Sequence, residues 1–94
     1  MARTLIKVII PALNEQNAVP EVIREIPSDL VNEIIVVDNG SHDKTFENAE
    51  KAGAKALKEP RKGYGQACLA GLSYVAGQNQ KPDIIVFILS LIHI

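Results

Sequence analysis

Acidic and amide side chains follow two aliphatic runs of the sequence, at the points where those runs stop. The run 5–10 is followed by Asn14 and Glu15, and the run 34–37 is followed directly by Asp38. Continuous apolar runs of this kind predict parallel strands that are covered on both faces. Ligands of open α/β sheets bind beyond the carboxyl ends of such strands. We therefore expect these side chains to meet at one rim, where carboxylates can accept hydrogen bonds from a ligand.

A basic loop with two glycines supplies the next candidates. Arg61 and Lys62 stand beside Gly63 and Gly65. The glycines allow a close backbone approach, and the two cations suit contact with a phosphate group or a base. A solvated basic loop without a ligand is the open alternative. The segment 63–68 also partly resembles a dinucleotide-binding fingerprint, but its third glycine is missing and it does not follow the first strand.

The elements that must position these residues alternate between strands and helices. We predict strands over 5–10, 34–38, 54–58 and 84 to about 89. The first helix buries Val19, Val22, Ile23 and Ile26, and the second runs from about Asp43 to Ala52 and ends at Gly53. The third carries one stripe of Gly65, Cys68, Leu69, Leu72, Val75 and Ala76, with Cys68 as an inert core thiol. Right-handed crossovers give an α/β fold with an open, doubly wound, mostly parallel, Rossmann-like sheet and flanking helices.

A tight turn is predicted between the second strand and the second helix. Asn39 and Gly40 permit positive φ there. We expect Ser41, Asp43 and Thr45 to cap the helix and hold the turn rather than to bind a ligand. His42 and His93 have no partner acids or cysteines at metal-ligand spacing, and we assign them no function.

Composition limits the classes of function. The 94 residues suffice for one small domain, and a net charge of -1 gives no general attraction to nucleic acid. A single cysteine excludes an internal disulfide and fits a reducing, cytoplasmic compartment. The start of the chain indicates a strand rather than a signal peptide. The apolar last eleven residues are fewer than the roughly 20 needed to span a bilayer.

Three motifs in these segments match one enzyme family. The first and second motifs match at Pro11, Asn14, Glu15, Asp38, Asn39, Gly40, Ser41, Asp43 and Thr45. The segment 59–67 is similar to the pattern Arg-x-x-Gly-x-(Gly/Ala)-x-Ala. Over about the first 88 residues, the chain thus resembles the inverting glycosyltransferases of family 2, which have a glycosyltransferase A-type fold. Its aliphatic pattern is most similar to members that act on polyprenyl phosphate acceptors.

The resemblance implies a nucleotide-binding role for ten residues. Asp38 would accept an N–H of the base, Glu15 would contact the ribose or the base, and Pro11 and Ala12 would line the nucleotide slot. Asn14, Asn39, Gly40, Arg61, Lys62 and Gly63 complete the implied set. Each carboxylate has a structural alternative: Asp38 as a turn or capping residue and Glu15 as a solvated acid. Pro11 has one too, as a plain strand terminator.

The resemblance implies transfer of a hexose from a UDP- or GDP-sugar to an acceptor such as polyprenyl phosphate. Family members bind a divalent metal, Mg²⁺ or Mn²⁺, through an Asp-x-Asp motif after the fourth strand, where it spreads charge on the leaving group. Here the segment 83–87 fits the approach to that motif, but no acid follows Asp83. We therefore assign no catalytic residue and no metal ligand, and expect no turnover by this chain alone.

The end of the chain departs from the family pattern. We interpret residues 1–88 as the N-terminal, nucleotide-sugar-binding half of a glycosyltransferase domain, and residues 89–94 as an atypical apolar tail with a shifted or foreign origin. An unpaired aliphatic strand favours association, so self-association through residues 84–94 is expected. The alternative function is a non-catalytic nucleotide-binding or self-associating module. For the full-length protein, peripheral membrane association is left open beside a cytoplasmic location.

Overall fold

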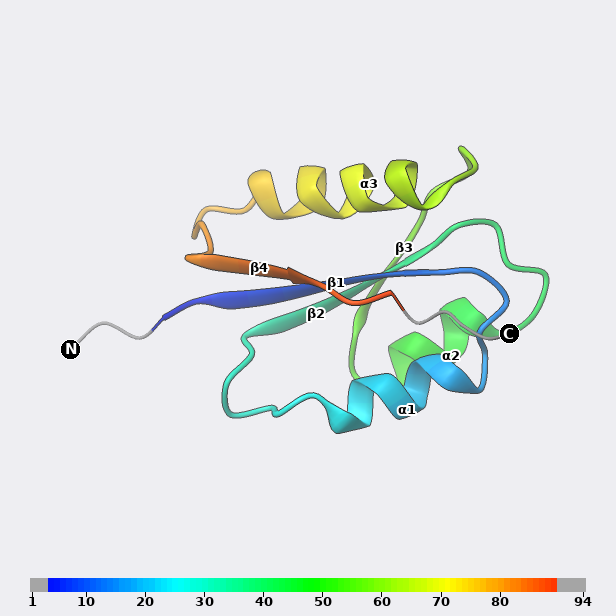
Figure 1. The fold of residues 1–94 in the computed structure, drawn as a ribbon, viewed down its shortest axis with the longest axis horizontal. Coiled ribbons are helices and arrows are strands. Elements are labelled where there is room, and N and C mark those ends of the chain that lie inside the picture. The colour runs from blue at the N-terminus through cyan, green and yellow to red at the C-terminus, as the bar shows by residue number, and fades with distance from the viewer. Residues whose placement is uncertain (1–3, 90–94) are drawn as a thin grey trace.

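Four parallel strands form the sheet at the centre of the molecule (Figure 1). The computed structural model describes residues 4–89. The strands are β1 (Ile6–Ala12), β2 (Glu33–Asp38), β3 (Lys55–Lys58) and β4 (Ile84–Phe87), in the spatial order β3-β2-β1-β4. The helices are α1 (Ala18–Glu25), α2 (Thr45–Lys51) and α3 (Tyr64–Ala76). The predicted fold class and order of elements are confirmed.

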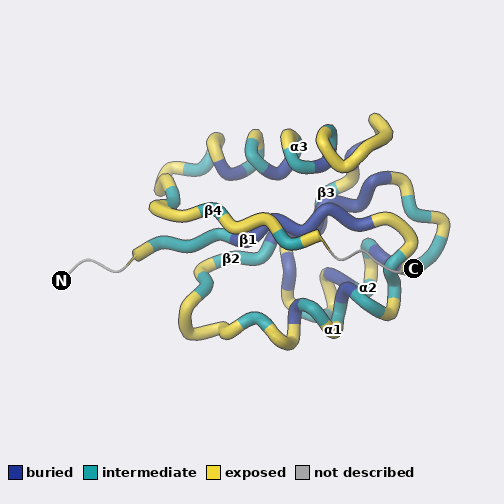
Figure 2. Tube along the Cα trace, viewed as in Figure 1, coloured by how far each residue is buried: buried dark blue, intermediate teal, exposed yellow. Residues whose placement is uncertain are grey.

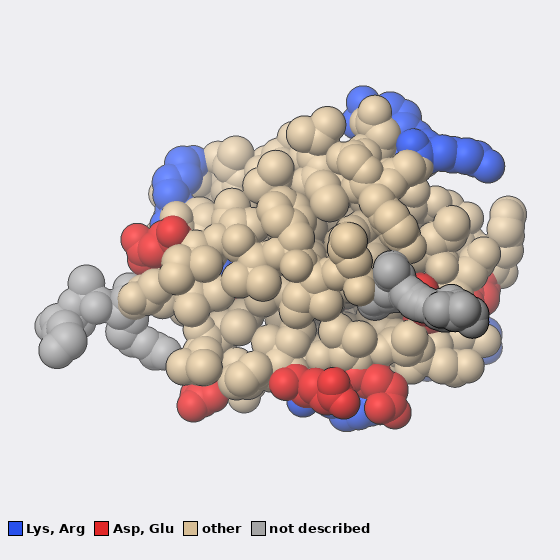
Figure 3. Space-filling view, in the orientation of Figure 1, with Lys and Arg blue, Asp and Glu red and all other residues tan. Residues whose placement is uncertain are grey.

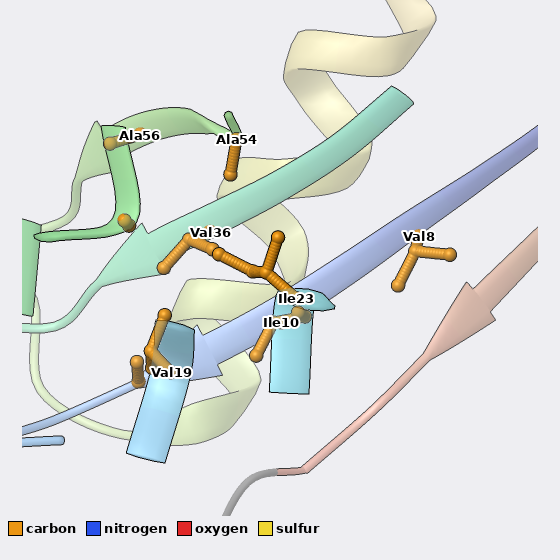
Figure 4. Packing of buried hydrophobic residues seen from close by; sticks show 9 residues of the cluster. Val8, Ile10, Val19, Ile23, Val36, Ala54 and Ala56 are labelled. Atoms are coloured by element: carbon orange, nitrogen blue, oxygen red, sulfur yellow. The ribbon is translucent and has the colours of Figure 1, made fainter. Parts of the chain in front are cut away.

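The two faces of the sheet bury alternate residues of the same strands. Val8, Ile10 and Val36 belong to the cluster on the side of α1 and α2, where Figure 4 shows Val19 and Ile23 near Ile10 and Val36. Ile9, Ile35 and Val37 pack on the opposite face, against α3. A strand that is covered on both faces needs apolar side chains at every position, which explains the continuous aliphatic runs. The central strands are accordingly the most buried part of the molecule (Figure 2).

The first strand is longer than predicted, because it continues through Pro11 and Ala12 as far as the loop. Pro11 pairs in register with Val37, so the interpretation of Pro11 as a strand terminator is wrong. Proline lacks an N–H and is tolerated only where the sheet needs no donor. Ile9, on the same side of the strand, accepts a hydrogen bond from the Ile88 N–H at 3.0 Å, and β4 has ended at Phe87. Pro11 therefore faces a side where no further ladder bond is required.

The third helix buries only part of the stripe predicted from the sequence: Val75 is buried and Leu72 packs against the core, as predicted. Its buried residues are Ala67, Gly71 and Val75, whereas Leu69 is 56% exposed and Cys68 is only partly buried. Small residues face the sheet because the helix lies very close to β1. A Cβ atom placed on Gly71 would lie 2.6 Å from Cγ2 of Ile9. Close approach, which a hydrophobicity pattern does not register, thus decides the orientation of α3.

The other helices follow the predictions with small shifts at their ends. α1 buries Val19 and Ile23, as predicted. α2 begins at Thr45, two residues later than predicted, because the Asp43 carboxylate accepts hydrogen bonds from Thr45 and stays outside the helix. Gly53 has a φ of +104° just after α2, which confirms its predicted role at the helix end. No helix within residues 4–89 is long and apolar enough to cross a membrane.

The chain reverses its direction across the sheet between β1 and β4. α1 and α2 carry the chain from β1 outward to β2 and β3 along one face, and α3 returns along the other face to place β4 beside β1 (Figure 1). Because all four strands are parallel, the loops that follow β1, β2 and β3 leave from the same edge of the sheet. Such an edge is where α/β proteins bind ligands.

A polar cluster at the amino end of β2 ties α3 to the sheet. Glu33 accepts hydrogen bonds from Lys7 Nζ at 3.0 Å, Tyr74 Oη at 2.7 Å and Gln78 Nε2 at 3.0 Å. Burial alone would raise the pKa of Glu33, but the donors Gln78, Tyr74 and Lys7 outweigh it and hold the pKa below its usual 4.5. The cluster therefore stabilises the fold more strongly when Glu33 is ionised than when it is protonated.

Glu33→Gln should remove this pH-dependent stabilisation. Because the pKa is lower in the folded state, the contribution of Glu33 is complete at neutral pH and is lost as the pH falls below about 4.5. Urea unfolding at pH 7, 5 and 3.5 should show a difference between wild type and Glu33→Gln that shrinks at the lowest pH. Tyr74→Phe, which removes one donor, should give a smaller loss at pH 7. A difference that is independent of pH would contradict this account.

Gly71→Ala should destabilise the fold by about 1–3 kcal/mol, because the new methyl group would overlap the fully buried, β-branched Ile9. Gly65→Ala in the same helix is the matched control, since a Cβ there meets nothing within 4 Å. Its expected effect is a gain of up to about 1 kcal/mol from helix propensity. Chemical denaturation of both variants tests the pair, and equal stabilities would show that α3 does not pack this closely.

Candidate functional site

A cleft of about 530 Å³ opens at the carboxyl edge of the sheet. The loop after β1 contributes Leu13 and Asn14 to its walls. The other lining residues come from the loops after β2 and β3 and from the start of α3: Asn39, Gly40, His42, Pro60, Lys62, Gly63 and Tyr64. The volume lies in the range typical of small-molecule and cofactor sites. Segments far apart in the sequence thus meet at one site, as the two aliphatic runs predicted.

A seam of hydrogen bonds joins the loop after β1 to the loop after β2. The Asn14 N–H donates to Ser41 Oγ at 2.8 Å, and Asn14 Oδ1 accepts from the His42 N–H at 2.8 Å. The Glu15 N–H donates to Thr45 Oγ1, also at 2.8 Å. Asn14 has a φ of +53°, a conformation that asparagine tolerates better than most residues. These bonds confirm the turn-holding role predicted for Ser41 and Thr45.

The carboxylate of Asp43 also belongs to this hydrogen-bonded seam. Its carboxylate accepts hydrogen bonds from the hydroxyl and N–H of Thr45 and from the N–H of Gln16 at 3.3 Å. Burial would raise the pKa of Asp43, but the bonds from Thr45 and Gln16 outweigh it and lower the pKa below its usual 3.8. Asp43 thus holds the turn through hydrogen bonds within the protein, as predicted.

Asp38 lies at the end of β2 and lines a second hollow of about 360 Å³. The hollow shares Gly40 and Pro60 with the main cleft, so the two spaces adjoin. Only 5% of Asp38 is exposed, and its Oδ1 accepts a hydrogen bond from the Ser41 N–H at 2.9 Å. No group within residues 4–89 donates to the other carboxylate oxygen, which leaves an acceptor for a bound molecule.

The two cations of the basic loop have different surroundings. Arg61 pairs with the buried Glu59, with Nε and an Nη 2.9 and 3.1 Å from the two carboxylate oxygens. This pairing lowers the pKa of Glu59 and raises that of Arg61 above its usual range. Arg61 does not line the cleft, whereas Lys62 does. Figure 3 shows Lys and Arg atoms gathered near the loop that leads into α3.

The ten residues predicted to bind a nucleotide therefore fall into distinct groups. Five line the main cleft: Asn14, Asn39, Gly40, Lys62 and Gly63. Asp38 lines the adjoining hollow, and the other four line neither space: Pro11, Ala12, Glu15 and Arg61. The nucleotide contact itself stays a prediction for all ten.

Sequence reasoning passed over several residues of the site. The cleft is also lined by Leu13, His42, Pro60 and Tyr64, and Glu59 fixes Arg61 beside it. Leu13 and Tyr64 are 42% and 39% exposed, which is high for apolar side chains. The sequence signal that could have placed Tyr64 at the site was its position directly after Gly63, beside the basic loop. His42 gave none, since it has no partner acids at metal-ligand spacing.

The described residues do not assemble a metal site. Within 4–89, no three His, Cys, Asp or Glu side chains gather so that they could hold an ion.

The chain matches a known family over most of its length. A family model described as glycosyl transferase family 2 covers residues 7–89. The chain belongs to this family. An uncharacterised glycosyltransferase of Mycobacterium tuberculosis is 42% identical over 72 residues, covering 77% of this chain and 32% of the relative. The glucosyl-3-phosphoglycerate synthase of Mycolicibacterium smegmatis is 38% identical, covering 88% of this chain and 29% of the relative.

Solved structures of family-2 members confirm the fold. The glucosyl-3-phosphoglycerate synthase of M. tuberculosis in complex with Mn²⁺, UDP-glucose and glycerol 3-phosphate superimposes with a TM-score of 0.77 at 37% identity. The match covers 95% of this chain and 34% of that chain. The same enzyme has been crystallised with Mg²⁺ and UDP, at a TM-score of 0.75 and 35% identity. This chain thus spans about a third of the length of its relatives.

Proposed function

We propose that this chain is the nucleotide-sugar-binding part of an enzyme that transfers a hexose from a UDP-sugar to an acceptor. The observation that carries the proposal is the cleft at the carboxyl edge, where three loops of a family-2 glycosyltransferase sheet converge. A related enzyme binds UDP and UDP-glucose in its crystal structures. The proposal concerns a longer enzyme, since the chain spans about a third of its relatives.

The base and the ribose would be held by the carboxylates of the rim. Asp38 offers a carboxylate oxygen that accepts no hydrogen bond within residues 4–89, and this oxygen can accept the imide N–H of uracil. Glu15 lies in the loop after β1. Its N–H already donates to Thr45 Oγ1, so its side chain would contact the ribose or the base. Pro11 and Ala12 form the buried floor from which this loop leaves.

The phosphate groups would be held by Lys62 and the glycine backbone. Lys62 stands on the cleft wall beside Gly63, whose φ of +111° excludes most other residues. Arg61 also remains a predicted phosphate ligand, but it would first have to leave Glu59, and the charge-assisted pair opposes that exchange. Lys62 is therefore the cation that the geometry favours.

The choice of base follows from the relatives. A carboxylate can accept an N–H from uracil or from guanine, so Asp38 alone does not separate UDP from GDP. The related enzyme was crystallised with UDP, which favours a uridine nucleotide. The same structures contain Mn²⁺ or Mg²⁺. A divalent metal is accordingly proposed for the longer enzyme, and its ligands are not assigned to this chain.

The class of acceptor is proposed from the relatives. The aliphatic pattern favoured polyprenyl phosphate, but the related enzyme was crystallised with phosphoglyceric acid and with glycerol 3-phosphate. Similarity to this enzyme favours a small phosphorylated acceptor over a lipid phosphate. A cytoplasmic location is part of the proposal, since one cysteine fits a reducing compartment.

Titration of the labelled chain with UDP, followed by amide NMR, tests the site. We expect shifts around residues 11–15, 38–41 and 61–65, and weaker shifts with GDP. Asp38→Asn keeps the side-chain shape but replaces an acceptor by a donor, and should weaken UDP binding about tenfold or more. Lys62→Ala should weaken UDP binding similarly while leaving uridine binding unchanged, because it removes a phosphate contact.

Lys51→Ala is the matched control for Lys62→Ala, since Lys51 lies on α2 away from the cleft. It should bind UDP like the wild type. Adding Mn²⁺ should not change where the shifts occur. Equal UDP affinities of wild type, Asp38→Asn and Lys62→Ala would reject the proposed site, and so would the absence of UDP binding at millimolar concentration.

A second proposal concerns self-association through β4. This strand bonds to β1 through the N–H groups of Ile84 and Ile88. The alternate residues Ile85 and Phe87 therefore direct their backbone groups toward the outer edge of the sheet, where residues 4–89 supply no further strand. The exposed apolar side chains nearby are Ile84, Val86, Phe87 and Leu89. An apolar open edge favours pairing with a second copy; residues 90–94, also predicted to take part, lie outside the described residues.

Val86→Lys should weaken this association, because a charge at a strand edge opposes pairing. Sedimentation velocity over a range of concentrations should show dimers or larger species for the wild type and a shift toward monomer for the variant. Leu30→Lys is the control, since Leu30 is 59% exposed but lies in the loop between α1 and β2. A wild type that stays monomeric at every concentration would disprove the association.

A further inference from the structure

The side chain of Asn39 joins the end of β2 to the basic loop through three hydrogen bonds. Its Nδ2 donates to the carbonyl oxygens of Glu59 at 3.0 Å and of Arg61 at 2.7 Å. Its Oδ1 accepts from the Gly63 N–H at 2.9 Å. Only 7% of Asn39 is exposed, and its own N–H donates to the Ala12 carbonyl at 2.9 Å. Asn39 therefore connects β1, β2 and the loop 59–63 at one point.

These bonds fix the wall of the cleft that carries Lys62. The residues bonded to Asn39 flank Pro60 and Lys62 in the sequence, and both of these line the cleft. The Gly63 carbonyl also accepts a hydrogen bond from the Ala67 N–H. The same anchor therefore holds the first turn of α3, which begins at Tyr64. The pair between Glu59 and Arg61 lies within the loop and does not attach it to the sheet.

A primary amide satisfies all three hydrogen bonds at this position. Only an amide side chain offers two N–H donors and one acceptor in the same plane. An aspartate has the same shape, but it would present a carboxylate to two carbonyl oxygens and lose both donated bonds. A buried acceptor facing other acceptors is destabilised, because no partner satisfies it. The Glu59 N–H also donates to the Asp38 carbonyl at 2.9 Å, so the type of residue at 39, and not only its size, decides whether the later part of the loop, Arg61 to Gly63, stays attached.

We propose that Asn39 is a positioning residue whose carboxamide sets the backbone of Lys62 and Gly63, and thereby determines how well the cleft holds the phosphate groups of a nucleotide. The phosphate part of this inference rests on the proposed function. The anchoring part rests only on the three hydrogen bonds of Asn39. Asn39 acts through Lys62, so its effect should appear with a diphosphate and not with a nucleoside.

The anchoring is tested by amide hydrogen exchange in the 94-residue chain. The Gly63 N–H should exchange at least about tenfold faster in Asn39→Ala and in Asn39→Asp than in the wild type, relative to the buried Val36. Dividing the exchange rate of the Gly63 N–H by that of the Val36 N–H removes the contribution of any change in global stability. Asn32→Ala is the matched control, because Asn32 Oδ1 accepts the Ile6 N–H at 2.7 Å at the opposite end of the sheet. It should leave the relative exchange of Gly63 unchanged.

The coupling to Lys62 is tested by affinity. Asn39→Asp should lower the affinity for UDP about tenfold while changing the affinity for uridine less than about twofold. In a Lys62→Ala background, Asn39→Asp should have little further effect on UDP, since the two changes remove the same contact. Equal effects of Asn39→Asp in the two backgrounds, or equal losses for UDP and uridine, would overturn the positioning role.

The two parts can fail separately. Absence of UDP binding by the unmodified chain would overturn the proposed function, and with it the phosphate part of this inference. Unchanged Gly63 exchange in both Asn39 variants would overturn the anchoring, whatever the chain binds. Faster Gly63 exchange together with a loss of affinity that is specific for UDP would support both parts.

Discussion

The burial of β1 and β2 on both faces is the constraint on which the rest of the molecule depends. Ile9, Ile10 and Ile35 are fully buried, and each such side chain contributes about 1.5–3 kcal/mol relative to exposure. Both faces can be covered only if the helices divide between them, which requires parallel strands and long crossovers. Because the strands are parallel, the loops after β1, β2 and β3 all begin at the carboxyl edge of the sheet. The position of the cleft is thus a consequence of core burial.

The polar residues of the carboxyl edge mainly satisfy the protein itself. Asn14, Ser41, Asp43 and Thr45 bond to backbone groups of neighbouring loops, because loops that leave a sheet carry donors and acceptors with no ladder partner. Motif residues of this kind hold the shape of a site. Within residues 4–89, one carboxylate oxygen of Asp38 accepts no hydrogen bond and Lys62 lines the cleft, so these two side chains are left for binding.

Charge is distributed unevenly within the basic loop. Glu59 is buried, and its carboxylate would be destabilised there without a partner. Arg61, although itself exposed, supplies that partner through two side-chain N–H groups and its backbone N–H, so its charge is compensated by Glu59. Lys62 contributes positive charge to the cleft. The two adjacent cations therefore have separate roles, one as the partner of Glu59 and one at the wall of the cleft.

The sequence by itself determined the parallel α/β fold, the order of elements and the edge at which the site lies. These follow from local patterns, since aliphatic runs at 5–10 and 34–37 have no alternative to burial on two faces. The turn at Gly53 and the buried face of α1 were likewise readable from residue types. The glycosyltransferase family was recognised from short motifs in the loops that leave this same edge of the sheet.

Only the tertiary structure decided which side chains at that edge are free. The sequence treated Arg61 and Lys62 alike, because the pairing with Glu59 depends on how the loop folds back. It predicted Val75 and Leu72 on the buried face of α3 but missed Ala67 and Gly71, because the closeness of Gly71 to Ile9 is a distance and not a pattern. It ended β1 too early, because the neighbouring strand determines whether Pro11 must donate a hydrogen bond. Each of these outcomes depends on contacts between residues far apart in the chain, which local residue types do not encode.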